Sequence, residues 1–143
     1  MPRMHKKEAW NKIELYMSIL TTLYMISIFL AFLDIKITKD SMDLLSLTVD
    51  DSLLHAYELN PWVRILIKYL GTDLGLTIHL FVECMLLTIL LAIPLETKKE
   101  FIYKTIIFLM IIYMHYIGII GWIKFREYLG YPLWLSARMF GKP

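Results

Sequence analysis

The chain has 143 residues, a formal net charge of +2 and hydrophobic residues at 58% of its positions. Soluble domains are usually about 45–50% apolar, so the composition excludes an ordinary soluble domain and indicates a single all-α membrane domain over residues 1–143. No run of basic residues is dense enough to indicate nucleic-acid binding.

A first membrane-spanning helix is predicted over about residues 15–33, ending before Asp34. Its apolar run of about 19 residues is longer than the roughly 7–15 residues of a signal-peptide core, and no cleavage site of small residues follows it. We therefore expect this segment to stay in the protein as a membrane span.

Short helices are expected in the loop over residues 40–71. Asp40 or Ser41 can cap a first helix, and Asn60 followed by Pro61 is typical of a second helix start, with Asn at the N-cap and Pro at the first helical position. About ten residues are too few to cross a bilayer, so we expect these helices to lie in the headgroup region.

The second and third spans are predicted over about residues 75–95 and 101–122. Only the link 96–100 separates them, so the two helices should form an antiparallel hairpin. The C-terminal tail carries Trp134 and Phe140, which are typical of another short helix at the membrane interface.

Lysine and arginine residues predict the orientation. With three spans, the N-terminus and the 96–100 link share one side, and the 35–74 loop and the C-terminal tail share the other. Basic residues are denser close to the span ends on the first side. The N-terminus and the link are therefore expected to be cytoplasmic, and the loop and the tail outside, in a prokaryotic cytoplasmic membrane.

Polar side chains inside the spans should meet at the outer end of the bundle. Glu83 lies in the middle of the second span, with His79 one helical turn before it. His79 and His115 are equally far from the middle of the link, so the hairpin places them at one depth. Asp34 ends the first span at the same end, and Tyr113 should lie at the level of Glu83. A shared polar centre is therefore predicted.

Three interpretations of this centre stay open. The first is a structural cluster in which Glu83 is hydrogen-bonded between helices. The second is a site for copper, zinc, iron or b-type haem. The third is proton or ion handling through Glu83. The candidate metal ligands are His79, Glu83 and His115, which His55 and Glu58 from the loop could complete.

One pattern resembles a family of small, uncharacterised prokaryotic integral membrane proteins, which share an Asp near the end of one span and a Glu-x-Asn-Pro motif opening a later segment. The resemblance covers about residues 34–83. Members typically carry a lysine in the next span, where this chain has His79. The resemblance implies a membrane fold and a common polar cluster of Asp34, Glu58 and Asn60, and it implies no particular activity. The matching residues are Asp34, Thr38, Glu58, Asn60 and Pro61.

No catalytic motif is recognisable, because no serine stands in a nucleophile motif and no glycine-rich phosphate loop is present. The leading hypothesis is a small non-catalytic accessory subunit of a larger membrane-embedded enzyme or respiratory-type complex. Its expected partners are the lipid bilayer and other membrane subunits or a second copy of the chain. The alternatives are a small metal- or haem-binding membrane protein and a component that handles protons or ions through Glu83.

Overall fold

The computed structural model describes the backbone of residues 2–131 and the side chains of residues 12–131. In this part of the chain every regular element is a helix, which confirms the all-α fold. The predicted helix in the C-terminal tail lies outside the described residues. In chain order the elements are α1 (Pro2–Leu45), η1 (Asp51–Tyr57), α2 (Pro61–Leu70), α3 (Thr72–Ala92) and α4 (Lys98–Tyr128).

Three of these helices are long and apolar enough to cross a membrane, as the sequence predicts. The qualifying segments are Lys12–Leu45, Thr72–Ala92 and Lys98–Tyr128. α3 ends close to the predicted boundary, just before Pro94. α4 begins with a capping box, in which the side chains of Thr97 and Glu100 bond each other's backbone N–H groups.

α1 is longer than the predicted span, since it continues past Asp34 for about three more turns. The predicted helix start at Asp40 or Ser41 is wrong, because both residues lie inside α1. No glycine or proline interrupts the chain between residues 3 and 45, so nothing in the backbone ends the helix. Ser41 does not cap a new helix, since its hydroxyl donates to the carbonyl of Ile37 within the same helix (2.6 Å).

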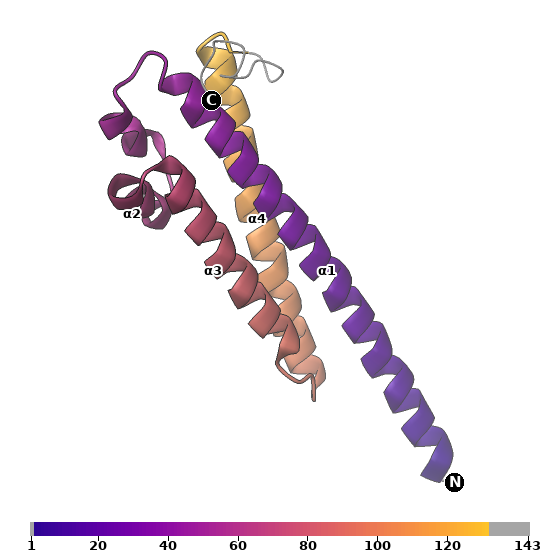
Figure 1. The fold of residues 1–143 in the computed structure, drawn as a ribbon. Helices are drawn as coiled ribbons and strands as arrows, with labels where there is room; N and C mark the ends of the chain where they lie inside the picture. Colours follow the sequence, from indigo (N-terminus) through magenta and orange to yellow (C-terminus); the bar gives the residue numbers. More distant parts are fainter. Residues whose placement is uncertain (1, 132–143) are drawn as a thin grey trace.

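The long helices form an open bundle in which α1 lies against both others (Figure 1). α3 and α4 run antiparallel, as predicted, and their link lies at the same end as the N-terminus (Figure 1). Among the described residues, close backbone packing joins α1 to α4 and α1 to α3, but not α3 to α4. The hairpin is therefore splayed, and α1 holds its two arms together.

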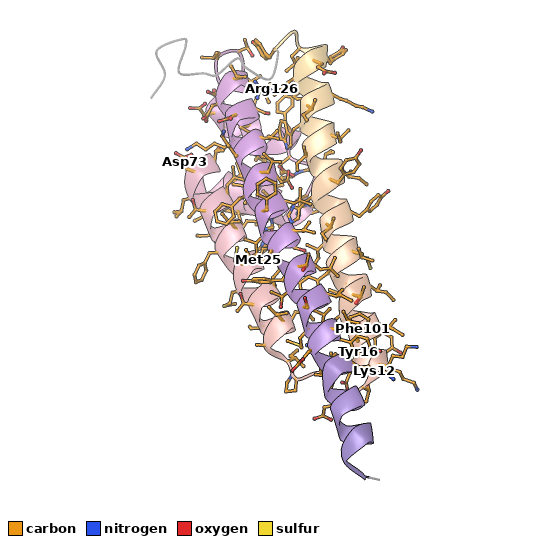
Figure 2. All side chains as sticks on the ribbon, turned by 90° about the vertical axis from the view of Figure 1, so that its right-hand side faces the viewer. Lys12, Tyr16, Met25, Asp73, Phe101 and Arg126 are labelled. Atoms are coloured by element: carbon orange, nitrogen blue, oxygen red, sulfur yellow. The ribbon has the colours of Figure 1, made fainter. Side chains whose placement is uncertain are left out.

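The end of the bundle near the link is closed by aromatic and polar contacts. The rings of Tyr16 and Phe101 stack at 4.2 Å between centroids, and Figure 2 shows them at the opposite end of the bundle from Arg126. The buried ammonium group of Lys104 donates to the main-chain carbonyl of Ile93, one of the carbonyls that the end of α3 leaves without a helical partner.

Two apolar clusters fill the bundle at different heights. One lies beside the link end and contains Leu20, Leu87 and Phe108. The other lies where η1 and α2 fold against the long helices. Its buried members are Met42, Leu45, Leu54, Val63, Ile67, Leu76 and Trp122.

α2 begins and ends as the sequence predicts. The side chain of Asn60 accepts hydrogen bonds from the N–H groups of Trp62 and Val63, and Pro61 occupies the first turn. Gly71 then turns the chain into α3 with a φ of 80°, a conformation that residues with a side chain rarely adopt. α2 therefore folds back onto the first turns of α3.

Gly75 lets α2 and α3 approach each other. A Cβ atom on Gly75 would lie 2.8 Å from the carbonyl carbon of Leu66 and 2.9 Å from the backbone nitrogen of Ile67. We expect Gly75→Ala to lower the free energy of unfolding by about 1–3 kcal/mol, because backbone atoms must move to make room. Denaturant titration in detergent micelles measures this loss.

Gly121 supplies the matched control, since a Cβ atom there meets nothing within 4 Å. Gly121→Ala should leave stability unchanged or raise it by up to about 1 kcal/mol through helix propensity. Equal stability losses in the two variants would contradict the tight contact between α2 and α3.

Candidate functional site

A histidine held between two carboxylates joins the three long helices. His115 of α4 is 6% exposed, and its two ring nitrogens face opposite neighbours. Nδ1 lies 2.9 Å from Oδ2 of Asp34 on α1, and Nε2 lies 2.7 Å from Oε1 of Glu83 on α3. The predicted polar centre therefore exists, and one imidazole links α1, α4 and α3.

The hydrogen bonds fix the number of protons in this centre. Each of the two contacts of His115 needs one proton between nitrogen and oxygen. An imidazolium between two carboxylates meets this need, and so does a neutral imidazole beside one protonated carboxyl group. In both cases the side chains of Asp34, His115 and Glu83 together carry one negative charge.

His79 extends the centre along α3. Its Nε2 lies 3.6 Å from Oε2 of Glu83, one helical turn further along the same face. This carboxylate oxygen is fully buried and has no hydrogen-bond partner. A buried hydrogen-bond acceptor without a donor lowers the stability of the fold, so a further donor near Oε2 would be stabilising. His79 and His115 thus approach the same acid from two helices, as their matched depth predicts.

Gly118 makes the approach of α1 to α4 possible at this height. A Cβ atom on Gly118 would lie 2.9 Å from both carboxylate oxygens of Asp34. Only a glycine leaves room for the carboxylate to reach His115, which lies one turn earlier on α4. Gly118 is not among the residues predicted from the sequence, although a glycine one turn from a histidine in an apolar span is a visible signal.

A cavity of about 980 Å³ opens beside the centre. It lies between the splayed helices α3 and α4 and under the segment that joins η1 to α2, and most of its lining is apolar. A second cavity of about 360 Å³ adjoins it at His79 and Glu83 and continues toward Leu90. The polar residues that line the large cavity are Asp34, Thr38, Tyr57, Glu58, Asn60, His79, Glu83 and His115.

The cavity brings together most of the polar residues singled out from the sequence. Glu58 is 7% exposed, and its carboxylate accepts the N–H of Asn60 at 2.8 Å. The guanidinium of Arg64 donates to the main-chain carbonyl of Glu58, which fixes the turn before α2. Burial raises the pKa of Glu58, and the negative charge of Asp34 raises it further.

Two predicted residues stand apart from the centre. Tyr113 is 61% exposed and lines neither cavity, so its placement beside Glu83 is wrong. The reason is helical geometry, since Tyr113 lies two residues before the inward-facing His115 and therefore points nearly the opposite way. His55 lies in η1, half-buried, and lines neither cavity.

The candidate metal ligands His79, Glu83 and His115 lie together, but their nitrogens and oxygens face one another. Within residues 12–131, no three histidine, cysteine, aspartate or glutamate side chains are arranged to hold a metal ion. A metal or haem iron at His115 would have to displace a hydrogen-bonded carboxylate from one ring nitrogen.

No protein-family model matches the chain, and no curated protein or solved structure is detectably similar to it. The resemblance over residues 34–83 therefore stays a prediction.

Gly118→Ala tests the contact between Asp34 and His115. The added methyl group should push the carboxylate away from Nδ1, leaving a buried imidazole with one partner instead of two. We expect the Nδ1 proton of His115, observed by ¹⁵N NMR in detergent, to exchange faster with water. Gly121→Ala is the control, and an unchanged Nδ1 signal in Gly118→Ala would contradict this role of Gly118.

Glu58→Gln tests the burial of Glu58, since a glutamine oxygen can still accept the N–H of Asn60. The folded-state pKa of Glu58 is raised above the unfolded value, so the folded protein holds this proton more tightly. The stabilisation is present at low pH and is lost as the pH rises through the raised pKa.

We therefore expect Glu58→Gln to gain thermal stability over the natural chain as the pH rises from about 4 to 8. All other groups are shared by the two proteins, so the difference in unfolding temperature isolates Glu58. A constant difference across this range would show that Glu58 titrates as an exposed carboxylate does.

Proposed function

We propose that this chain is a small membrane protein whose polar centre takes up and releases a proton. The observation that carries the proposal is the contact between His79 and the unpartnered Oε2 of Glu83, next to a triad with one negative charge. This is the third of the interpretations that the sequence leaves open.

The charge of the centre favours one further proton. With His79 neutral, the four side chains Asp34, His115, Glu83 and His79 carry one negative charge in an otherwise apolar part of the bundle. A proton on His79 makes them neutral as a group and places a positive charge 3.6 Å from Oε2 of Glu83. An isolated charge is expensive in this surrounding, so the gain is larger than it would be in water.

The proton has access to the centre from the cavity. His79 and Glu83 line both cavities, and the larger one extends to Glu58 and Asn60 between η1 and α2. The groups that face the centre come from every element around it: Asp34 from α1, His115 from α4 and Glu58 from the connecting segment. Glu58 provides a second titratable carboxylate between the centre and this end of the bundle.

The orientation belongs to the same proposal. The density of lysine and arginine near the N-terminus and the 96–100 link favours a cytoplasmic position for both. η1 and α2 would then lie at the outer membrane surface, with α2 in the headgroup region. The centre would exchange protons with the outer side.

The role of an accessory subunit in a larger membrane-embedded enzyme or respiratory-type complex stays a prediction, and so does self-association. Both are compatible with proton uptake, because a partner against the exposed side of α4 would cover the cavity. The metal- or haem-binding alternative also stays a prediction.

Glu83→Gln tests the proposal. Replacing the carboxylate removes the negative charge that favours protonation of His79. We expect the natural chain to take up more protons than Glu83→Gln when detergent-solubilised protein is shifted from pH 8 to pH 6. Proton uptake is measured with a pH-indicator dye in weakly buffered solution.

Glu127→Gln is the matched control. Glu127 is an exposed glutamate near the end of α4, and it lines neither cavity. This variant should therefore behave as the natural chain does. Equal proton uptake by the natural chain and Glu83→Gln would overturn the proposal.

A further inference from the structure

The large cavity is far bigger than a proton site needs. Its volume of about 980 Å³ lies at the upper end of the range for sites that bind organic molecules, about 300–1,000 Å³. Most of its lining is apolar, with side chains such as Val63, Leu76 and Ile111. A few polar groups converge at one place in an apolar surface, which is the usual composition of a ligand site.

The charged residues that line the cavity determine whether it favours a cationic or an anionic ligand. Three carboxylates line the cavity, those of Asp34, Glu58 and Glu83, against the imidazoles of His79 and His115. No lysine or arginine is among the described lining residues. Arg64 lies nearby, but its guanidinium donates to the main-chain carbonyl of Glu58. The centre therefore presents one negative charge to the cavity and attracts cations.

The cavity opens through the side of the bundle. Its lining includes Leu59, which is 83% exposed, together with Met110 and Met114 of α4, which are also largely exposed. Met114 is the residue next to His115, so the opening lies at the depth of the polar centre and within the apolar part of α4. A ligand dissolved in the bilayer reaches the carboxylates through this opening without crossing the aqueous phase.

We propose that the cavity binds an apolar organic cation that enters from the bilayer between Leu59 and α4. The cation lies against the carboxylates of Glu83 and Asp34, and its apolar body fills the space between α3 and α4. This inference rests on the proposed proton function, because the carboxylate of Glu83 takes part in both cation binding and proton uptake. Cation and proton therefore compete for the same negative charge.

Two ions of nearly equal size and opposite charge test the sign of the site. Tetraphenylphosphonium is a permanent cation, and tetraphenylborate is its anionic counterpart. We expect tetraphenylphosphonium to bind saturably to the protein in nanodiscs of uncharged lipid at pH 8, measured by calorimetry against empty nanodiscs. Tetraphenylborate should bind at least about tenfold more weakly, because its charge opposes that of the carboxylates. Equal affinities, or tighter binding of the anion, would overturn the proposal.

Substitutions locate the site without relying on the polar centre alone. Met114→Trp narrows the opening and should weaken tetraphenylphosphonium binding at least about tenfold. Tyr113→Trp is the matched control, since Tyr113 is equally exposed but lines neither cavity, and it should bind as the natural chain does. Weakening by both tryptophan variants alike, or by neither, would contradict entry between Leu59 and α4.

Glu83→Gln and the pH dependence separate the two proposals. Tetraphenylphosphonium should bind at least about tenfold more weakly to Glu83→Gln, and more weakly to the natural chain at pH 6 than at pH 8. If proton uptake depends on Glu83 but tetraphenylphosphonium does not bind, the cation site is overturned and the proposed proton function stands. If tetraphenylphosphonium binds but proton uptake does not depend on Glu83, the proton function is overturned and the cation site stands.

Discussion

The bundle depends on one buried imidazole that reaches carboxylates on two other helices. α3 and α4 do not pack closely along each other among the described residues, yet both are tied to α1 and to one another through His115. Apolar side chains can slide past each other in lipid at little cost, because lipid is as apolar as they are. A buried ionic contact has no such freedom, since removing either partner leaves a charge without compensation. His115 therefore fixes the register of all three spans.

The same contact leaves space beside it. α1 approaches α4 closely because Gly118 has no side chain, and α1 also packs against α3. With both arms of the hairpin held by α1, the third side between α3 and α4 stays open below η1 and α2. The splayed hairpin, the cavity and the polar centre are thus consequences of a single arrangement. A closely packed hairpin would have removed the cavity.

Much of this arrangement was predictable because membrane spans obey a few strong constraints. Span length, the short link and the helical rise were enough to place His79 and His115 at one depth, with Glu83 one turn deeper. Asn60 and Pro61 defined the start of α2 through local hydrogen bonding alone.

Predictions failed where they depended on the direction in which a side chain points around its helix, or on whether a helix continues past a charged residue. Tyr113 was predicted from its depth alone, and a depth argument does not say which way a side chain points around the helix axis; Tyr113 is exposed. The prediction ended the first span before Asp34, because a charged residue usually marks the end of an apolar run. Here no glycine or proline follows Asp34 before Leu45, so the helix continues past the charge.

The position of the centre along the bundle limits what a proton can do there. The polar groups lie between two apolar clusters, one around Leu76 and Trp122 and the other around Leu87 and Phe108. Beyond Glu83 the smaller cavity continues only between apolar side chains such as Leu90 and Ile107. A proton that reaches Glu83 from the η1 and α2 end meets no further polar group lining this path. Under the proposed function, proton uptake would therefore change the charge of this centre without passing the proton further along the bundle.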